Sequence, residues 1–270
     1  GVKGAAFATG IAQVLSTIFF LSHFLRKKSN LKLVKFKFDF KTIGKIISLG
    51  FPDCTSELSV GLVTILFNQS LMRFIGQDAL ISYSVICYIN TLVSMTMVGI
   101  TQGVQPLISF NFGARESENV NSLFKMGIKT ICITAITVFT LCLLFANNIT
   151  ALFIDTKEVQ LFNSTVSVFK LYSFSFLFLG FNLIISGFFV AIDKPICSAI
   201  ISLGRSLVLV VISLFVLTKL FGGDGIWVTT DVSEFITLII SLSLLFKFFK
   251  EEKKKVKDKS SDVLENPFIQ

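Results

Sequence analysis

The feature that most constrains this chain is a series of long apolar stretches. An α-helix rises about 1.5 Å per residue, so about 20 apolar residues cross the hydrocarbon core of a bilayer. The chain contains seven such stretches, separated by charged residues or turn signals, at residues 4–24, 44–74, 79–110, 126–146, 164–192, 196–219 and 226–248. Every backbone polar group needs an internal partner in lipid, and the alternating pattern of barrel strands is absent. The predicted fold class is therefore all-α, a polytopic transmembrane helix bundle.

The amino-acid composition argues against a water-soluble fold. Hydrophobic residues make up 53% of the chain and charged residues 16%, and 31 of the 270 residues are phenylalanine. A soluble domain cannot bury so many apolar side chains. The net charge of +8 does not indicate nucleic-acid binding, because Lys and Arg flank the apolar stretches and form no basic face with interleaved aromatic residues. The lipid bilayer is the expected partner.

Motifs of enzymes and metal sites are missing from the sequence. The five cysteines lie in apolar stretches and His23 is the one histidine, so we expect reduced core thiols and no metal site. The sequence has no GxxxxGK[ST] phosphate-binding loop, no GxSxG elbow and no Cys and His pattern for nucleophilic catalysis. We therefore expect neither an enzyme nor an ATP-driven pump, and no cofactor.

The distribution of Lys and Arg predicts the orientation of the chain in the cell membrane. Cytoplasmic loops carry the excess of these residues, and 19 of the 25 fall on one side of the predicted topology. They lie at 26–45, 115–129, 194 and 247–259. Only four lie on the opposite side, while Lys170 and Arg205 fall within spans. The N-terminus is predicted to be outside and the C-terminus cytoplasmic.

The second and third spans are longer than a membrane requires, so each is expected to be broken, strongly tilted or extended beyond the bilayer as an amphipathic turn. Gly50-Phe51-Pro52 is the predicted break in the second span, because Pro52 cannot donate to the helical ladder. Gln102-Gly103-Val104-Gln105-Pro106 predicts an interruption near the end of the third. Broken helices at membrane depth are tolerated where protein or a watery cavity satisfies the backbone, as in transporters.

Asp53 and Glu57 are the predicted cation-coupling residues. A carboxylate at membrane depth is unfavourable, so its presence suggests a function, and the i, i+4 spacing places both on one helix face. Glu57 is the stronger candidate for binding a proton or sodium ion. The structural alternatives are that Asp53 is a helix N-cap after Pro52 and that Glu57 is a hydrogen-bonding anchor.

Buried amides are the predicted substrate-path residues. Asn68 lies on the same helix face as Glu57, and Asn90 and Asn182 fall in the third and fifth spans. These side chains could line a cavity for cationic, amphipathic compounds, since an amide donates and accepts hydrogen bonds. Hydrogen bonding between packed helices is an equally open alternative.

Two other pairs of polar residues are assigned structural roles. Asp231 and Glu234 open the last span from its outer end, where we expect a solvated helix start more than an ion site. Gln102 and Gln105 are expected to serve packing and kinking where the third span meets the cytoplasm.

Four sequence patterns together resemble one known family. They are residues 1–9 (GVKGAAFAT), residues 50–52 (GFP) followed by Glu57 and Asn68, residues 102–108 (QGVQPLI) with 111–114 (NFGA), and Asn182 through 188–192 (FFVAI) to Arg205. The chain resembles the multidrug and toxic compound extrusion family of efflux transporters, in particular the C-terminal portion of its bacterial branch. The third pattern is the most specific of the four.

This resemblance implies an architecture and an activity. Family members have twelve helices in two six-helix lobes and exchange protons or sodium ions for organic cations and related drugs by alternating access. The implied organisation is the last helix of the first lobe (1–24), a basic cytoplasmic linker (25–43), a six-helix second lobe (44–249) and a disordered cytoplasmic tail (250–270), with the N-terminal lobe missing. Glu57, with Asp53, would then bind the coupling ion, and Asn68, Asn90 and Asn182 would face the substrate path.

Two alternatives stay open at the level of sequence. One is a lipid-linked oligosaccharide flippase of the same superfamily, a group that tends to use cationic cavity residues. The other is a seven-helix membrane receptor, because the helix count and orientation coincide.

Overall fold

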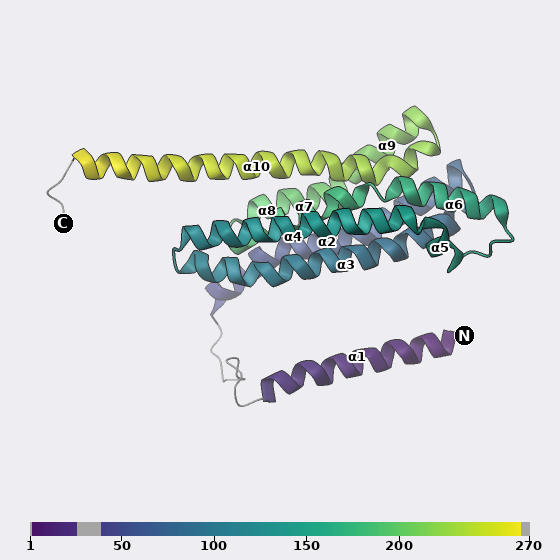
Figure 1. Ribbon diagram of the computed structural model, residues 1–270, viewed down its shortest axis with the longest axis horizontal. Coiled ribbons are helices and arrows are strands. Elements are labelled where there is room, and N and C mark those ends of the chain that lie inside the picture. Colours follow the sequence, from purple (N-terminus) through teal and green to yellow (C-terminus); the bar gives the residue numbers. More distant parts are fainter. Residues whose placement is uncertain (1, 26–38, 266–270) are drawn as a thin grey trace. The chain divides into compact units, whose positions relative to one another are not determined.

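The structure, a computed structural model, describes residues 2–25 and 39–265 (Figure 1). Every element within these ranges is helical, which confirms the predicted all-α class. The elements are α1 (Val2–Leu25), α2 (Phe40–Phe74), α3 (Gln77–Gly113), α4 (Ser117–Leu144), α5 (Ala146–Ala151), α6 (Val159–Tyr172), α7 (Ser175–Ala191), α8 (Pro195–Leu203), η1 (Gly204–Val208), α9 (Leu209–Phe221) and α10 (Asp224–Glu265). Residues 1–44 and 45–270 form two compact units, which are described separately.

The predicted membrane class is confirmed by the lengths of the helices. Five segments of the described chain are long and apolar enough to cross a bilayer: Gln77–Gly113, Ser117–Leu144, Val159–Ala191, Pro195–Phe221 and Asp224–Glu252. They match five of the seven predicted spans. The first predicted span contains a shorter apolar helix, Ala6–Ser22, and α2 does not meet the criterion over its described residues. The chain is therefore a multi-pass membrane protein.

The predicted breaks at two prolines are wrong. The helix α2 continues through Gly50-Phe51-Pro52, and α3 continues past Pro106 to Gly113. A proline inside a helix removes one backbone hydrogen bond. In membrane helices the freed carbonyl can be satisfied by neighbouring groups, so the helix need not end there.

Two other predicted spans are interrupted instead. The fifth is divided into α6 and α7, and the sixth contains the π-helical turn η1. At the first interruption Ser173 Oγ donates to the Phe169 carbonyl at 2.8 Å, and Ser175 Oγ donates to the Tyr172 carbonyl at 2.7 Å. Such side-chain bonds compete with the backbone ladder and favour a bend.

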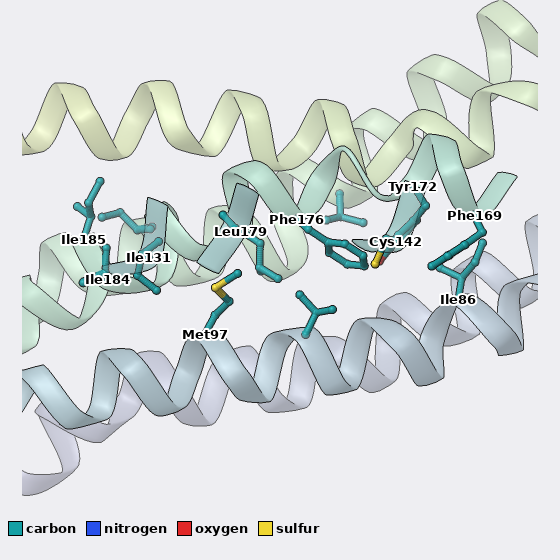
Figure 2. Close-up of a cluster of buried hydrophobic side chains, with 14 of the residues drawn as sticks. Ile86, Met97, Ile131, Cys142, Phe169, Tyr172, Phe176, Leu179, Ile184 and Ile185 are labelled. Atoms are coloured by element: carbon teal, nitrogen blue, oxygen red, sulfur yellow. The ribbon is translucent and has the colours of Figure 1, made fainter. Parts of the chain in front are cut away.

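The core of the unit 45–270 is centred on α7. The most apolar part of the α6–α7 segment is 67% buried, against 22 to 28% for the other four segments, so α7 is the inner helix. It packs against α3, α4, α8 and α10. Figure 2 shows the cluster in which Met97 of α3 and Ile131 of α4 face Leu179 and Ile184 of α7, all of them buried. The outer helices leave many large apolar side chains exposed, as expected for contact with lipid.

Two helices end in the same hydrogen-bonded turn, and in each turn a residue other than glycine has a positive φ. After α3 the backbone N–H of Arg115 donates to Phe112 and that of Glu116 to Asn111, and Arg115 has a φ of 61°. After α7 the same pattern places Asp193 at a φ of 60°. This is the Schellman motif, whose left-handed position is usually glycine.

An Arg115→Gly variant should be more stable than the parent by about 1 kcal/mol, because the left-handed conformation is unfavourable for a residue with a Cβ. The thermal unfolding midpoint in detergent measures the gain. Ala114→Gly is the matched control, since Ala114 has a φ of −75° and should lose stability there. A lower midpoint for Arg115→Gly would show that contacts of the arginine side chain outweigh the backbone strain.

The cytoplasmic segments predicted around residues 25–43 and 250–270 are partly described. Asp39 caps α2: its carboxylate accepts hydrogen bonds from the Thr42 hydroxyl and from the backbone N–H groups of Lys41 and Thr42, which lower the pKa of Asp39. At the other end α10 extends to Glu265, into the tail that we expected to be disordered. Lys and Glu are good helix formers, so a charged segment can extend a helix beyond the bilayer. Residues 26–38 and 266–270 lie outside the described residues.

Candidate functional site

A carboxylate lies buried among α7, η1 and α10. Glu234 of α10 is 5% exposed. The Asn182 amide of α7 donates to Glu234 Oε2 at 2.8 Å and to the Glu234 carbonyl at 2.9 Å, while Ser241 Oγ donates to Asn182 Oδ1 at 3.0 Å. Arg205 of η1 places Nη1 at 3.3 Å from Glu234 Oε1. The carboxylate is thus held by an amide on one oxygen and a guanidinium on the other.

The expected solvated helix start at Asp231 and Glu234 is corrected by this geometry. Because α10 begins at Asp224, Glu234 lies about 15 Å along the helix axis at about 1.5 Å per residue. Both carboxylate oxygens of Asp231 are shielded from solvent and accept no well-formed hydrogen bond from the described residues. The backbone of Ser175 faces them.

A second feature is a polar cavity of about 190 Å³ between α2, α3, α7, α8 and η1. Glu57 of α2 and Arg205 of η1 are among its lining residues. Its other lining residues include Thr101, Gln102, Gln105, Ser186 and Ser202. The glutamines for which we expected a packing role therefore have access to this cavity. At about 30 Å³ per molecule of liquid, the space suits a few waters or a small cation.

One wall of the cavity is fixed by hydroxyl groups. Ser186 Oγ of α7 lies 2.8 Å from Ser198 Oγ and 3.0 Å from Ser202 Oγ, both of α8. Gly187, the next residue, also lines the cavity, and a Cβ there would lie 2.5 Å from Thr101 Cγ2. The absence of a side chain at 187 therefore allows α3 and α7 to approach closely.

Of the predicted site residues whose side chains the structure describes, Glu57 alone is among those that line this cavity. Glu57 is exposed on α2 and makes no hydrogen bond or ion pair with any described residue. Asp53 lies within α2, but its side chain is outside the described residues. Asn68 is exposed on α2 and Asn90 is half-buried on α3, and neither is among the residues that line the cavity with Glu57.

Asn182 has contacts different from those expected of a substrate-path residue. Its side chain is 0% exposed and its amide is occupied by Glu234 and Ser241. This corresponds to the interhelical hydrogen bonding that the sequence left open. The partnership of Asn182, Arg205 and Glu234 was missed, although an acid and a base within predicted spans were a signal that could have revealed it.

Comparisons with known proteins agree on one family. The profile of the MatE family matches residues 52–216. The chain is 24% identical over 249 residues to the multidrug export protein MepA of Staphylococcus saprophyticus, covering 91% of this chain and 54% of that protein. It is 26% identical over 253 residues to MepA of Staphylococcus haemolyticus, covering 90% and 54%. The chain thus spans about half the length of the curated relatives it matches.

Solved structures share the fold. A multidrug resistance MATE family transporter of the MOP superfamily in an outward-facing conformation superposes with a TM-score of 0.82 at 20% identity, covering 94% of this chain and 57% of that one. A MOP superfamily transporter from Pyrococcus furiosus, described as having a binding pocket of reverse polarity that suggests a different function, gives 0.77 at 19% identity, covering 88% and 54%.

Proposed function

Because this chain belongs to the MatE family of membrane transporters, we propose that it supplies the second half of a multidrug efflux antiporter. That transporter exports drugs or organic cations in exchange for protons or sodium ions by alternating access. Members of such a family are transport proteins and not enzymes, and the family assignment sets the receptor alternative aside. We propose in the same way that a first lobe completes the transporter, that drugs are its cargo and that a coupling ion drives their export.

The observation that carries this function is the free carboxylate of Glu57 on the wall of a polar cavity. A cationic compound is attracted by a carboxylate that has no counter-charge among the described residues. The cavity of about 190 Å³ is smaller than the roughly 300 to 1,000 Å³ of drug-sized pockets. A drug would therefore need walls from a first lobe as well, where Asn68 and Asn90 are proposed to face its path.

The flippase alternative is less well supported by the charges of the cavity. A site for an anionic, lipid-linked sugar would need a surplus of cationic side chains. Among the described lining residues the cation is Arg205, and it is paired with Glu234. The charge left free on the wall is that of Glu57, which is negative and favours cationic cargo.

The proposed orientation follows from the basic residues. The N-terminus would lie outside and the C-terminus in the cytoplasm, because 19 of the 25 Lys and Arg fall on the latter side. Digestion of a C-terminal tag by protease added to intact cells would contradict this orientation.

A Glu57→Gln variant of the full-length protein should lose efflux of a fluorescent cation such as ethidium by about tenfold, in the range of coupling energies between sites. Efflux from loaded cells that carry equal amounts of each variant measures the loss. Glu118→Gln, at an exposed position in the first turn of α4, is the matched control and should retain efflux. Parental efflux by Glu57→Gln would remove this carboxylate from the mechanism.

A further inference from the structure

Arg205 contacts one carboxylate and shares a cavity with a second one in different surroundings. On one side its guanidinium contacts Glu234, whose side chain is 6% exposed. On the other side Arg205, 21% exposed, lines the cavity that also contains Glu57. The same guanidinium can therefore be the counter-ion of a buried acid or of a cavity acid.

The contact with Glu234 leaves the guanidinium free to move. Its single hydrogen bond to the carboxylate is 3.3 Å long, whereas charge-assisted bonds are about 2.7 to 2.9 Å and strong arginine pairs are bidentate. Arginine has five N–H donors, and Arg205 makes no other hydrogen bond to the residues that the structure describes.

The backbone around Arg205 also favours movement. Arg205 lies in η1, a single π-helical turn whose residues are all at least partly exposed. Such turns interrupt the regular hydrogen-bond ladder of a helix and are frequent at functional sites. Glu234 is more firmly placed, since the Asn182 amide bonds both its carboxylate and its carbonyl.

The charges of this region do not balance within the described residues. Glu57, Asp231 and Glu234 are three carboxylates, and Arg205 is the one guanidinium near them. The oxygens of Asp231 are shielded from solvent and accept no well-formed hydrogen bond from the described residues, although the Ser175 backbone faces them. An uncompensated charge at membrane depth is unfavourable, so the region is suited to take up a proton or a monovalent cation.

We propose that Arg205 moves between Glu234 and Glu57, and that Glu234 binds a proton or sodium ion when Arg205 leaves it. This proposal rests on the antiport function and gives it a mechanism. An organic cation beside Glu57 takes the place of Arg205, which returns to Glu234 and expels the bound ion. Ion and drug then cannot be held at once, which is the requirement for exchange.

The other groups that face Glu234 set the conditions for this exchange. In the described chain the titratable and charged ones are Arg205 from η1, Tyr172 from α6, and Asp231 from α10 itself. The helix α7 contributes the neutral amide of Asn182. Arg205 is therefore the cation whose position decides whether the Glu234 carboxylate has a counter-charge.

Carbodiimide labelling of the full-length protein in detergent tests this proposal without transport. Dicyclohexylcarbodiimide modifies protonated carboxyl groups in apolar surroundings, and tandem mass spectrometry assigns the modified residue. At neutral pH an Arg205→Gln variant should label about tenfold more at Glu234, because the favourable charge partner is gone. A Glu57→Gln variant should label about threefold less at Glu234, because Glu57 no longer competes for Arg205. Threefold corresponds to the modest strength of an exposed ion pair.

Two further labelling experiments identify the coupling ion and test whether a bound organic cation changes the labelling of Glu234. If sodium couples, sodium chloride should protect Glu234 relative to choline chloride; if the proton couples, only pH should change the labelling. Tetraphenylphosphonium should reduce labelling of Glu234 in the parent and leave it unchanged in Glu57→Gln. Arg205→Lys should restore part of the response that Arg205→Gln loses. Arg73→Gln, which removes a cation from the last turn of α2, should behave as the parent.

The outcomes separate this proposal from the proposed function. Labelling of Glu234 that is independent of Glu57 and of tetraphenylphosphonium would show that Arg205 is a fixed structural partner, and would overturn the exchange even if drugs were exported. Labelling that responds to both while efflux is absent would support the exchange and refute drug export. Failure to label Glu234 at any pH in both the parent and Arg205→Gln would also overturn the proposal.

Discussion

A Gly225→Ala variant is expected to lose the native packing of α9 against α10, with a destabilisation of about 3 kcal/mol or more, at the upper end of what overpacking costs. A Cβ at position 225 would lie 2.2 Å from the carbonyl oxygen of Leu217 and 2.5 Å from its carbonyl carbon. These are backbone atoms of α9, so no side-chain rotation can relieve the clash. Relief requires that one helix moves against the other.

The matched control is Gly99→Ala on α3, where a Cβ would meet no atom within 4 Å. Alanine has a higher helix propensity than glycine, so this variant should keep or exceed the parental stability. Thermal unfolding and size-exclusion profiles in detergent measure both variants. If Gly225→Ala unfolded at the parental midpoint, the close approach of α9 and α10 would not be part of the stable fold.

Hydropathy predicted the membrane-spanning elements better than their ends. The span expected at 126–146 belongs to a helix that begins at Ser117, because a helix can continue into water on polar residues that a hydropathy window excludes. Likewise Pro52 and Pro106 were expected to break helices, while the interruption occurs near Ser173, which bonds its own backbone. Local sequence signals do not show whether a helix finds compensation from its neighbours.

Glu57 was chosen from the sequence because an acid in an apolar stretch is conspicuous by itself, and the structure places it among the residues that line the cavity. Glu234 was visible as an acid in a predicted span, but its partners were harder to identify, since Asn182 is 52 residues away and Arg205 is 29 residues away. Each of these residues was visible in the sequence. The relative rotation and depth of α7, η1 and α10, which bring them together, result from packing over the whole unit.

The aromatic cluster around Phe188 leads to a second large effect. Phe188 of α7 is 1% exposed. Its ring centroid lies 4.3 Å from that of Phe124, 5.9 Å from those of Phe189 and Phe248, and 6.2 Å from that of Phe249. One side chain therefore joins α4, α7 and α10 near the cytoplasmic end of α10 proposed above. Buried aromatic pairs contribute beyond their area, because edge and face contacts are favourable.

A Phe188→Ala variant should lose about 3 to 5 kcal/mol of stability, the range for removing a buried aromatic side chain and leaving a cavity. Phe246→Ala is the matched control, because Phe246 lies on α10 and is 73% exposed, and a surface change of this kind is worth about 0.5 kcal/mol or less. Denaturant or thermal unfolding in detergent compares the two. Equal unfolding midpoints for the two variants would mean that the Phe188 ring does not stabilise the packing of α4, α7 and α10. A selective loss in Phe188→Ala would instead show that the buried aromatic side chain joins the three helices, since the two variants remove the same atoms and differ only in burial.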